Sequence, residues 1–182
     1  MSVLGIIKPL SLGSILGVAF SLSFSSMAYA QVSKEHKVKA AIIYNLARFS
    51  EWSLTPSTKE ASSFSMCVMA NDVMRDALAT LKGKEISGRR VEIMPLLSHG
   101  ANTSKCHILY VSGKALQNFD LQKLAENGVL TISDTENFLS AGGGITVLRT
   151  HNTLGFSINR TVMLKANIRP SSKILRLAKE VR

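Results

Sequence analysis

The stretch Phe64-Ser-Met-Cys-Val-Met-Ala70 is a short and almost unbroken apolar run that follows polar sequence and ends at Asn71-Asp72. A strand with one wet face alternates apolar and polar residues, whereas a continuous run of this length suits a strand that is covered on both faces, as in the middle of a parallel sheet. We therefore predict that Phe64 to Ala70 is the first core strand of an α/β domain.

A second run of the same kind, Cys106-His-Ile-Leu-Tyr-Val111, carries the only other cysteine of the chain besides Cys67. With the usual right-handed crossover, the first and third strands of a doubly wound sheet are neighbours. This arrangement would bring the two sulfur atoms within bonding reach. Because we also expect the protein to be exported to an oxidising compartment, we predict a structural disulfide between Cys67 and Cys106.

Helical and strand patterns alternate through the rest of the chain. Apolar residues at helical spacing, turn residues and caps predict the following elements: a helix from Lys34 to Trp52, the strand from Phe64, a helix capped by Asp72 and ended by Gly83, a strand from Arg89 to Leu96, a strand from Cys106 to Val111, a helix within Gly113 to Gly128, a strand from Val129 to Ser133, and a short helix from Asp134 or Thr135 to Leu139.

The C-terminal part has a different pattern. Two apolar segments, Ile145 to Arg149 and Leu154 to Ile158, flank His151-Asn152 and predict an antiparallel hairpin. Further on we expect a helix capped by Asn159, an extended segment from Ile168 to Pro170, and a last helix from Ser171 or Ser172 to Val181. The predicted fold is a single α/β domain, with a mostly parallel, mixed sheet of about five or six strands, helices on both faces and a C-terminal antiparallel hairpin.

The N-terminus has the features of a signal peptide. Residues 1–30 contain Lys8 as their only charge, an apolar core from Leu10 to Phe24, and the small-x-small sequence Ala28-Tyr29-Ala30. The apolar core is about 15 residues long, whereas a transmembrane helix needs about 20, so cleavage is favoured over an uncleaved anchor. We predict cleavage after Ala30, a single mature domain over residues 31–182, and a location in the periplasm.

The mature domain is basic. Lys8 is the only one of the chain's 22 Lys and Arg residues within the predicted signal peptide, and none of the 12 Asp and Glu lies there, so the mature net charge is about +9. For an exported protein, the matching acidic partner would be another protein, anionic lipid or a cell-wall polymer rather than nucleic acid. A solvated surface without a partner is the alternative.

The sequence contains no recognisable catalytic or metal-binding pattern. Its four histidines, at positions 36, 99, 107 and 151, have no ligand spacing with one another or with the cysteines. Gly-x-Ser-x-Gly, Ser-x-x-Lys, P-loop and dinucleotide-binding motifs are missing, and the glycines at 142 to 144 precede a strand rather than a helix. We predict that the protein is not an enzyme and binds no metal or cofactor, and that His107 is a buried, hydrogen-bonded residue.

The candidate binding residues are Arg48 and Trp52 near the end of the first helix and Arg169, Lys173 and Arg176 in the basic C-terminal stretch. A guanidinium beside an aromatic ring often holds a carboxylate or a partner protein, although either group can also be plain surface. We predict a partner-binding face that comprises these residues and the exposed edge of the hairpin.

Several segments together resemble the YfiR family, in order and with comparable spacing over about residues 36 to 181. They are Lys37-Val-Lys-Ala-Ala-Ile-Ile-Tyr-Asn-Leu-Ala-Arg-Phe-Ser-Glu-Trp52, Cys106-His107 at the head of a core strand, Val129-Leu-Thr-Ile-Ser-Asp134, Gly143-Gly144-Ile145, Phe156-x-Ile-Asn159 and Ser171-Ser-Lys-Ile-Leu-Arg-Leu-Ala178. Each motif is weak alone, whereas the ordered set is specific. The family's structural disulfide corresponds to Cys67 and Cys106.

The resemblance implies a regulator. The best understood member of the family is a periplasmic inhibitor that binds the periplasmic part of an inner-membrane diguanylate cyclase, keeps cyclic di-GMP low, and is itself withdrawn by an outer-membrane lipoprotein. The implied function here is therefore repression of such a cyclase, and with it of biofilm formation. A homodimer stays open, and so does a second class of function, a periplasmic solute-binding, sensory or enzymatic domain on an α/β scaffold.

Overall fold

The structure is a computed structural model that describes residues 34–53, 62–97 and 102–182. Residues from His36 to Arg182 form one compact unit. The predicted signal peptide and its cleavage site lie outside the described residues. Among the helices that the structure does describe, none has the length and apolar composition needed to cross a bilayer.

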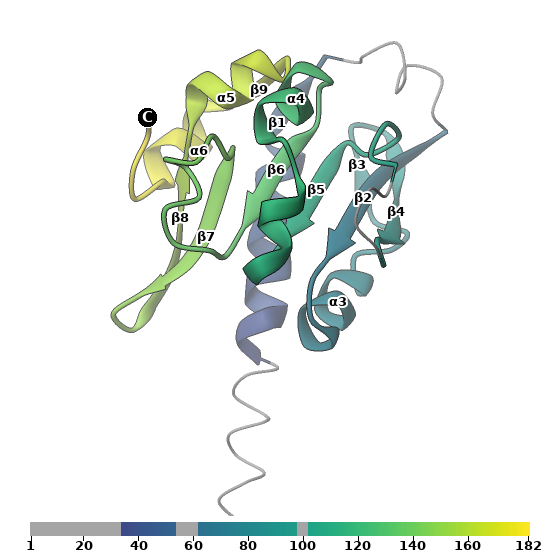
Figure 1. Cartoon of the computed structure of the whole chain (residues 1–182), viewed down its shortest axis with the longest axis horizontal. Helices are drawn as coiled ribbons and strands as arrows, with labels where there is room; N and C mark the ends of the chain where they lie inside the picture. Colours follow the sequence, from purple (N-terminus) through teal and green to yellow (C-terminus); the bar gives the residue numbers. More distant parts are fainter. Residues whose placement is uncertain (1–33, 54–61, 98–101) are drawn as a thin grey trace, which may run out of the picture. The chain divides into compact units, whose positions relative to one another are not determined.

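The centre of the unit is a seven-stranded sheet in the order β3-β4-β2-β5-β6-β7-β8 (Figure 1). Neighbouring strands from β4 to β7 run parallel, while the edge strands β3 and β8 pair antiparallel with β4 and β7. The predicted mixed, mostly parallel sheet is confirmed. The strands are β2 (Ser63–Met69), β3 (Glu85–Ile86), β4 (Arg89–Pro95), β5 (Ile108–Val111), β6 (Leu130–Ser133), β7 (Ile145–Thr150) and β8 (Thr153–Ile158).

Both faces of the sheet are buried, as the continuous apolar runs predict. Alternate residues of β2 enter different hydrophobic clusters, with Phe64 and Met66 in one and Cys67 in the other. The first cluster includes side chains of the first helix (residues 34–48), α3 (Asp72–Ala79), α5 (Arg160–Lys165) and α6 (Ser172–Leu177). The second includes side chains of α4 (Leu121–Glu126). Helices therefore cover both faces of the sheet.

The Cys67–Cys106 disulfide is confirmed. β2 and β5 are parallel neighbours, with Cys67 paired to Leu109. The two cysteine Cα atoms are 5.7 Å apart and both side chains are buried. The bond therefore joins the first core strand to the residues that immediately precede β5.

The first helix is shorter than predicted. It ends at residue 48, and Ser50–Trp52 forms a strand, β1, that pairs antiparallel with β9 (Ile168–Pro170) in a separate two-stranded sheet. The hydroxyl of Ser50 donates a hydrogen bond to the carbonyl oxygen of Leu46 (2.8 Å), which satisfies a carbonyl at the helix end. The prediction of a helix to Trp52 was wrong because pairing with β9, far away in the sequence, decides the conformation of these residues.

Four other details of the secondary structure also differ from the prediction. The Asn71 side chain, rather than that of Asp72, caps α3 by accepting from the amide of Met74 (3.0 Å). The predicted helix within residues 113–128 is split into a 3-10 helix, η1 (Gly113–Asn118), and α4, because Asp120 is extended and caps α4. Residues 134–139 form turns instead of a short helix. The sequence also gave no sign of β3, which a Ser87-Gly88 turn with positive φ at both positions joins to β4.

The last part of the chain combines confirmed caps with one wrong boundary. Asn159 caps α5 and Ser171 caps α6, while β7 and β8 form the predicted hairpin. However, α6 ends at Leu177 rather than Val181. The following residues extend along β8 and pair with it, so the hairpin edge that we expected to be exposed is covered between Phe156 and Arg160.

Candidate functional site

The two-stranded sheet brings the two candidate binding segments together. The amide of Ser171 donates to the carbonyl oxygen of Phe49 (3.2 Å), and the amide of Ser53 donates to that of Asn167 (3.1 Å). These bonds lie just outside the paired residues of β1 and β9. As a result, the end of the first helix lies beside the start of α6, although the sequence separates them by most of the domain.

An apolar groove lies between these segments, with a volume of about 310 Å³. Phe49 and Leu177 are large apolar side chains on its border, and they remain 38% and 65% exposed. Large exposed apolar groups that gather in one place, with polar groups around them, are typical of binding surfaces. We call this site the apolar groove, and its lining residues are Ile42, Asn45, Leu46, Phe49, Phe156, Lys173, Ile174 and Leu177.

Cations border the apolar groove. The Nζ of Lys173 lies 4.7 Å from the centroid of the Phe49 ring, and the Cζ of Arg48 lies 5.9 Å from it. Both distances are within the range of a cation–π interaction. Arg176, one turn after Lys173 on α6, is also exposed. The sequence-predicted residues Arg48 and Lys173 therefore flank one exposed aromatic ring, Phe49, and Arg176 lies on the same helix as Lys173.

Arg169 lies in a different cleft. It is exposed on β9, opposite Glu51 of β1, and lines a cleft of about 480 Å³. Arg160, at the start of α5, lines the same cleft together with Ser171 and Ser172. The cleft thus carries two guanidinium groups and one carboxylate. It adds positive charge next to the apolar groove, because Ser171 and Ser172 directly precede Lys173 of that groove.

Trp52 is half-buried and makes structural contacts. Its indole Nε1 donates a hydrogen bond to the carbonyl oxygen of Ala47 (2.8 Å). Its ring meets that of Phe64 edge to face, with centroids 4.9 Å apart. Trp52 therefore anchors β1 to the first helix and to the core, and a direct contact of this ring with a partner stays a prediction.

His107 is buried, as predicted, and its ring stacks on Phe64 with the centroids 4.6 Å apart. The amide of Ser65 donates to its Nδ1 (3.1 Å), and a terminal nitrogen of Arg89 lies 3.3 Å from its Nε2. Burial, and secondly the charge of Arg89, lower the pKa of His107 to about 4. A neutral imidazole held in this way by the core has a structural role.

A partly buried ion pair joins the first helix to the end of a sheet strand. Lys39 is only 8% exposed. Its Nζ lies 3.1 Å from the carboxylate of Asp134, which directly follows β6. Burial and the nearby charge of Asp134 also raise the pKa of Tyr110 on β5. No sequence motif identified this pair, because Lys39 lies in the helical pattern as an ordinary polar residue.

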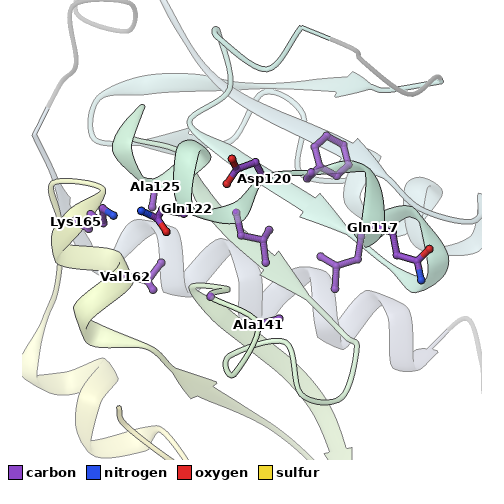
Figure 2. Close-up of a pocket in the computed structure, with 11 residues that line it drawn as sticks. Gln117, Asp120, Gln122, Ala125, Ala141, Val162 and Lys165 are labelled. Carbon is purple, nitrogen blue, oxygen red and sulfur yellow. The ribbon is translucent and has the colours of Figure 1, made fainter.

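A larger cavity, of about 570 Å³, lies between η1, α4, the turn at Ala141-Gly142 and α5 (Figure 2). Its polar lining residues are Gln117, Asp120, Gln122 and Lys165, which include no hydroxyl, thiol or imidazole. The Nζ of Lys165 lies 3.0 Å from the Glu126 carboxylate, to which Gln122 also donates (3.3 Å). The hydrogen bond from Lys165 is the main reason why the pKa of Glu126 is lowered. The cavity therefore has an apolar floor, but no nucleophile with a neighbouring base.

The fold and the apolar groove define an α/β domain with a candidate protein-binding face. The chain belongs to the YfiR/HmsC-like family (DUF4154), whose model matches residues 36–179. This match confirms the resemblance seen in the sequence. Members of this family are regulatory and non-catalytic, and membership indicates a regulator in cyclic di-GMP signalling.

Two solved structures are distantly similar. One is the ABC domain in complex with L-Trp from Streptococcus pneumonia, at 11% identity and a TM-score of 0.47, covering 69% of this chain and 57% of the other. The second is a conserved domain protein from Vibrio cholerae O1 biovar eltor, at 10% identity and a TM-score of 0.46, covering 65% and 54%. The chain thus spans little more than half of either structure. No curated protein matches the sequence.

Proposed function

We propose that the protein is a periplasmic regulator that binds the periplasmic domain of an inner-membrane diguanylate cyclase and represses it, which lowers cyclic di-GMP and biofilm formation. Membership of the YfiR/HmsC-like family supports this function. The observation on the molecule that carries it is the apolar groove, where Lys173 and Arg48 flank a Phe49 ring that the fold leaves exposed.

The chemistry of the groove defines what the partner must present. An apolar side chain of the partner would cover Phe49 and Leu177, and carboxylates around it would face Arg48, Lys173 and Arg176. Interface energy usually concentrates in a few such aromatic and arginine contacts. A stable interface buries about 800 Å² on each partner, so we expect contacts to continue from the groove to Arg169 and the neighbouring cleft.

The test separates binding from folding. Lys173→Glu and Leu177→Ala both alter the border of the groove at exposed positions, so the free energy of unfolding should stay within about 0.5 kcal/mol of the wild type. Binding to the purified periplasmic domain of the cyclase should weaken by at least about tenfold in each variant, as expected for hot-spot contacts. In cells, cyclic di-GMP should rise toward the level of a deletion strain.

The matched control is Lys123→Glu, which makes the same charge change at an exposed position on α4. This variant should bind and repress like the wild type. If deletion of the gene leaves cyclic di-GMP unchanged in every condition where the protein is expressed, the repression of a cyclase is refuted. Equal binding by Lys173→Glu and Lys123→Glu would instead refute the groove as the binding face.

The proposal also covers release of the repressor from the cyclase. An outer-membrane lipoprotein that withdraws the repressor would compete with the cyclase for this face, and the Lys173→Glu variant should then lose both partners.

The second candidate function is a periplasmic sensory domain for a small molecule, which the cavity of about 570 Å³ favours. Native mass spectrometry of the purified protein would reveal a retained small molecule if that function is correct.

A further inference from the structure

The edge of β8 is covered by a short segment that follows α6, Lys179 to Arg182, which we call the strap. The strap runs parallel to β8 and pairs with it through four main-chain hydrogen bonds. The amides of Lys179 and Arg182 donate to the carbonyl oxygens of Phe156 (2.8 Å) and Ile158 (2.9 Å). In return, the amides of Ile158 and Arg160 donate to the carbonyl oxygens of Glu180 (2.9 Å) and Arg182 (2.7 Å).

The strap adds little to the hydrophobic core. All four of its residues are exposed, including Val181 at 44%, and none belongs to either core cluster. Its side-chain bonds are polar and exposed, from the Arg182 guanidinium to Glu180 (2.6 Å) and Ser140 (2.7 Å). By contrast, Ile158, to which the strap is paired, is fully buried. The strap is therefore held at the edge mainly by main-chain hydrogen bonds and not by packing in the core.

We propose that the β8 edge is a strand-addition site, and that an extended, acidic segment of the protein partner replaces the strap when the complex forms. This inference rests on the proposed function. Main-chain groups of a sheet edge pair with any extended segment, which is why an uncovered edge is a common docking site. A segment on this edge would pair beside Phe156, which also lines the apolar groove, so the two surfaces are continuous.

Charge favours an acidic occupant. Arg160 donates its amide at one end of the paired edge, and Lys173 lies in the groove that Phe156 shares. Arg160 and Lys173 are both exposed, and neither takes part in the salt bridges found among the described residues. Carboxylates that flank an extended segment would thus meet one cation at the end of the edge and another in the adjoining groove.

The first arm of the test is amide hydrogen exchange of the free protein, measured residue by residue by NMR. If the strap opens, the amides of Lys179 and Arg182 should exchange at least about a hundredfold faster than the core amide of Leu130, which donates to His107 between β5 and β6. Equal protection of the strap and Leu130 would overturn the proposal, whether or not a partner is known.

The second arm adds the purified periplasmic domain of the cyclase. Replacement of the strap predicts a reciprocal change: the Lys179 and Arg182 amides lose protection, while those of Ile158 and Arg160 gain it because a new strand accepts their bonds. Binding that leaves all four amides unchanged would refute strand addition and leave groove docking intact. If the same changes in amide protection appear without the cyclase domain and the protein forms a dimer, a second copy of the chain is the occupant of the edge. That result would also overturn the proposal. Absence of any binding would refute the proposed function itself.

A pair of variants makes the same test by affinity. Lys179→Pro removes the amide donor to Phe156 and should bind the cyclase domain about tenfold more tightly, because less of the binding energy is needed to displace the strap. Lys179→Ala removes the same side chain but keeps the donor, and should bind like the wild type. Equal affinities of the two variants would contradict the inference.

Discussion

Removal of the Cys67–Cys106 disulfide should cost the domain a large part of its stability. The bond closes a loop with a sequence separation of 39 residues. In the chain-entropy model, a loop of this length restricts the unfolded chain by about 4 kcal/mol. Both sulfur atoms are buried, so the double variant Cys67→Ala/Cys106→Ala also loses packing, and we expect a total loss of about 4 to 6 kcal/mol. Typical domains have about 5 to 15 kcal/mol in all.

Urea unfolding, followed by circular dichroism, measures this loss. With a slope of about 2 kcal/mol/M, the unfolding midpoint of the double variant should fall by about 2 M or more. Each single variant should lose nearly as much as the double variant, since either change already breaks the bond. A midpoint within about 0.5 M of the wild type would refute the reasoning, and so would an intact mass showing two free thiols in unreduced wild-type protein.

Three further predictions concern the buried polar groups and one tight turn. The His107 imidazole has its pKa lowered to about 4 from 6.5, so the unfolded chain binds more protons between these values. The free energy of unfolding should be highest above about pH 6.5 and should fall by up to about 3 kcal/mol as the pH is lowered toward 4. In urea unfolding, His107→Gln should remove this part of the pH dependence. Asp134→Asn removes the charge opposite the buried Lys39 and should cost about 2 kcal/mol, whereas Glu92→Gln at the exposed Lys82 pair should change the unfolding free energy by less than about 0.5 kcal/mol. Gly143→Ala would place a methyl group on the fully buried Phe138 ring and should lower stability by about 1 to 3 kcal/mol in thermal unfolding; an unchanged midpoint would contradict this.

The parts of the fold that local pattern determines could be predicted from the sequence. The continuous apolar runs identified β2 and β5 because both faces of these strands are buried, and the turn at His151-Asn152 identified the β7–β8 hairpin. The neighbouring position of β2 and β5, and with it the disulfide, followed from the handedness of crossover connections.

The parts that depend on distant residues could not. Ser50 to Trp52 continue a helical pattern, and only their pairing with Ile168 to Pro170 makes them a strand. For the same reason the sequence gives no sign that Phe49 is exposed: its spacing from the buried Leu46 matches one face of a helix, whereas the structure leaves Phe49 exposed beside Lys173. Charged residues of the site were found because basic side chains cluster in the sequence, but the apolar residues between them look like any other core residues.

The pairing of β1 with β9 has a consequence for the order in which the domain assembles during synthesis. The first helix is synthesised early, whereas Ile168 to Leu177 follow only when nearly the whole domain has been made. Until then the Phe49 side of the helix has no α6 beside it, and contacts of such long sequence separation form late in folding. A chain that has been synthesised only in part can therefore form β2 and its helix without the apolar groove, so the groove is gained in a single late step that follows synthesis of the C-terminal segment.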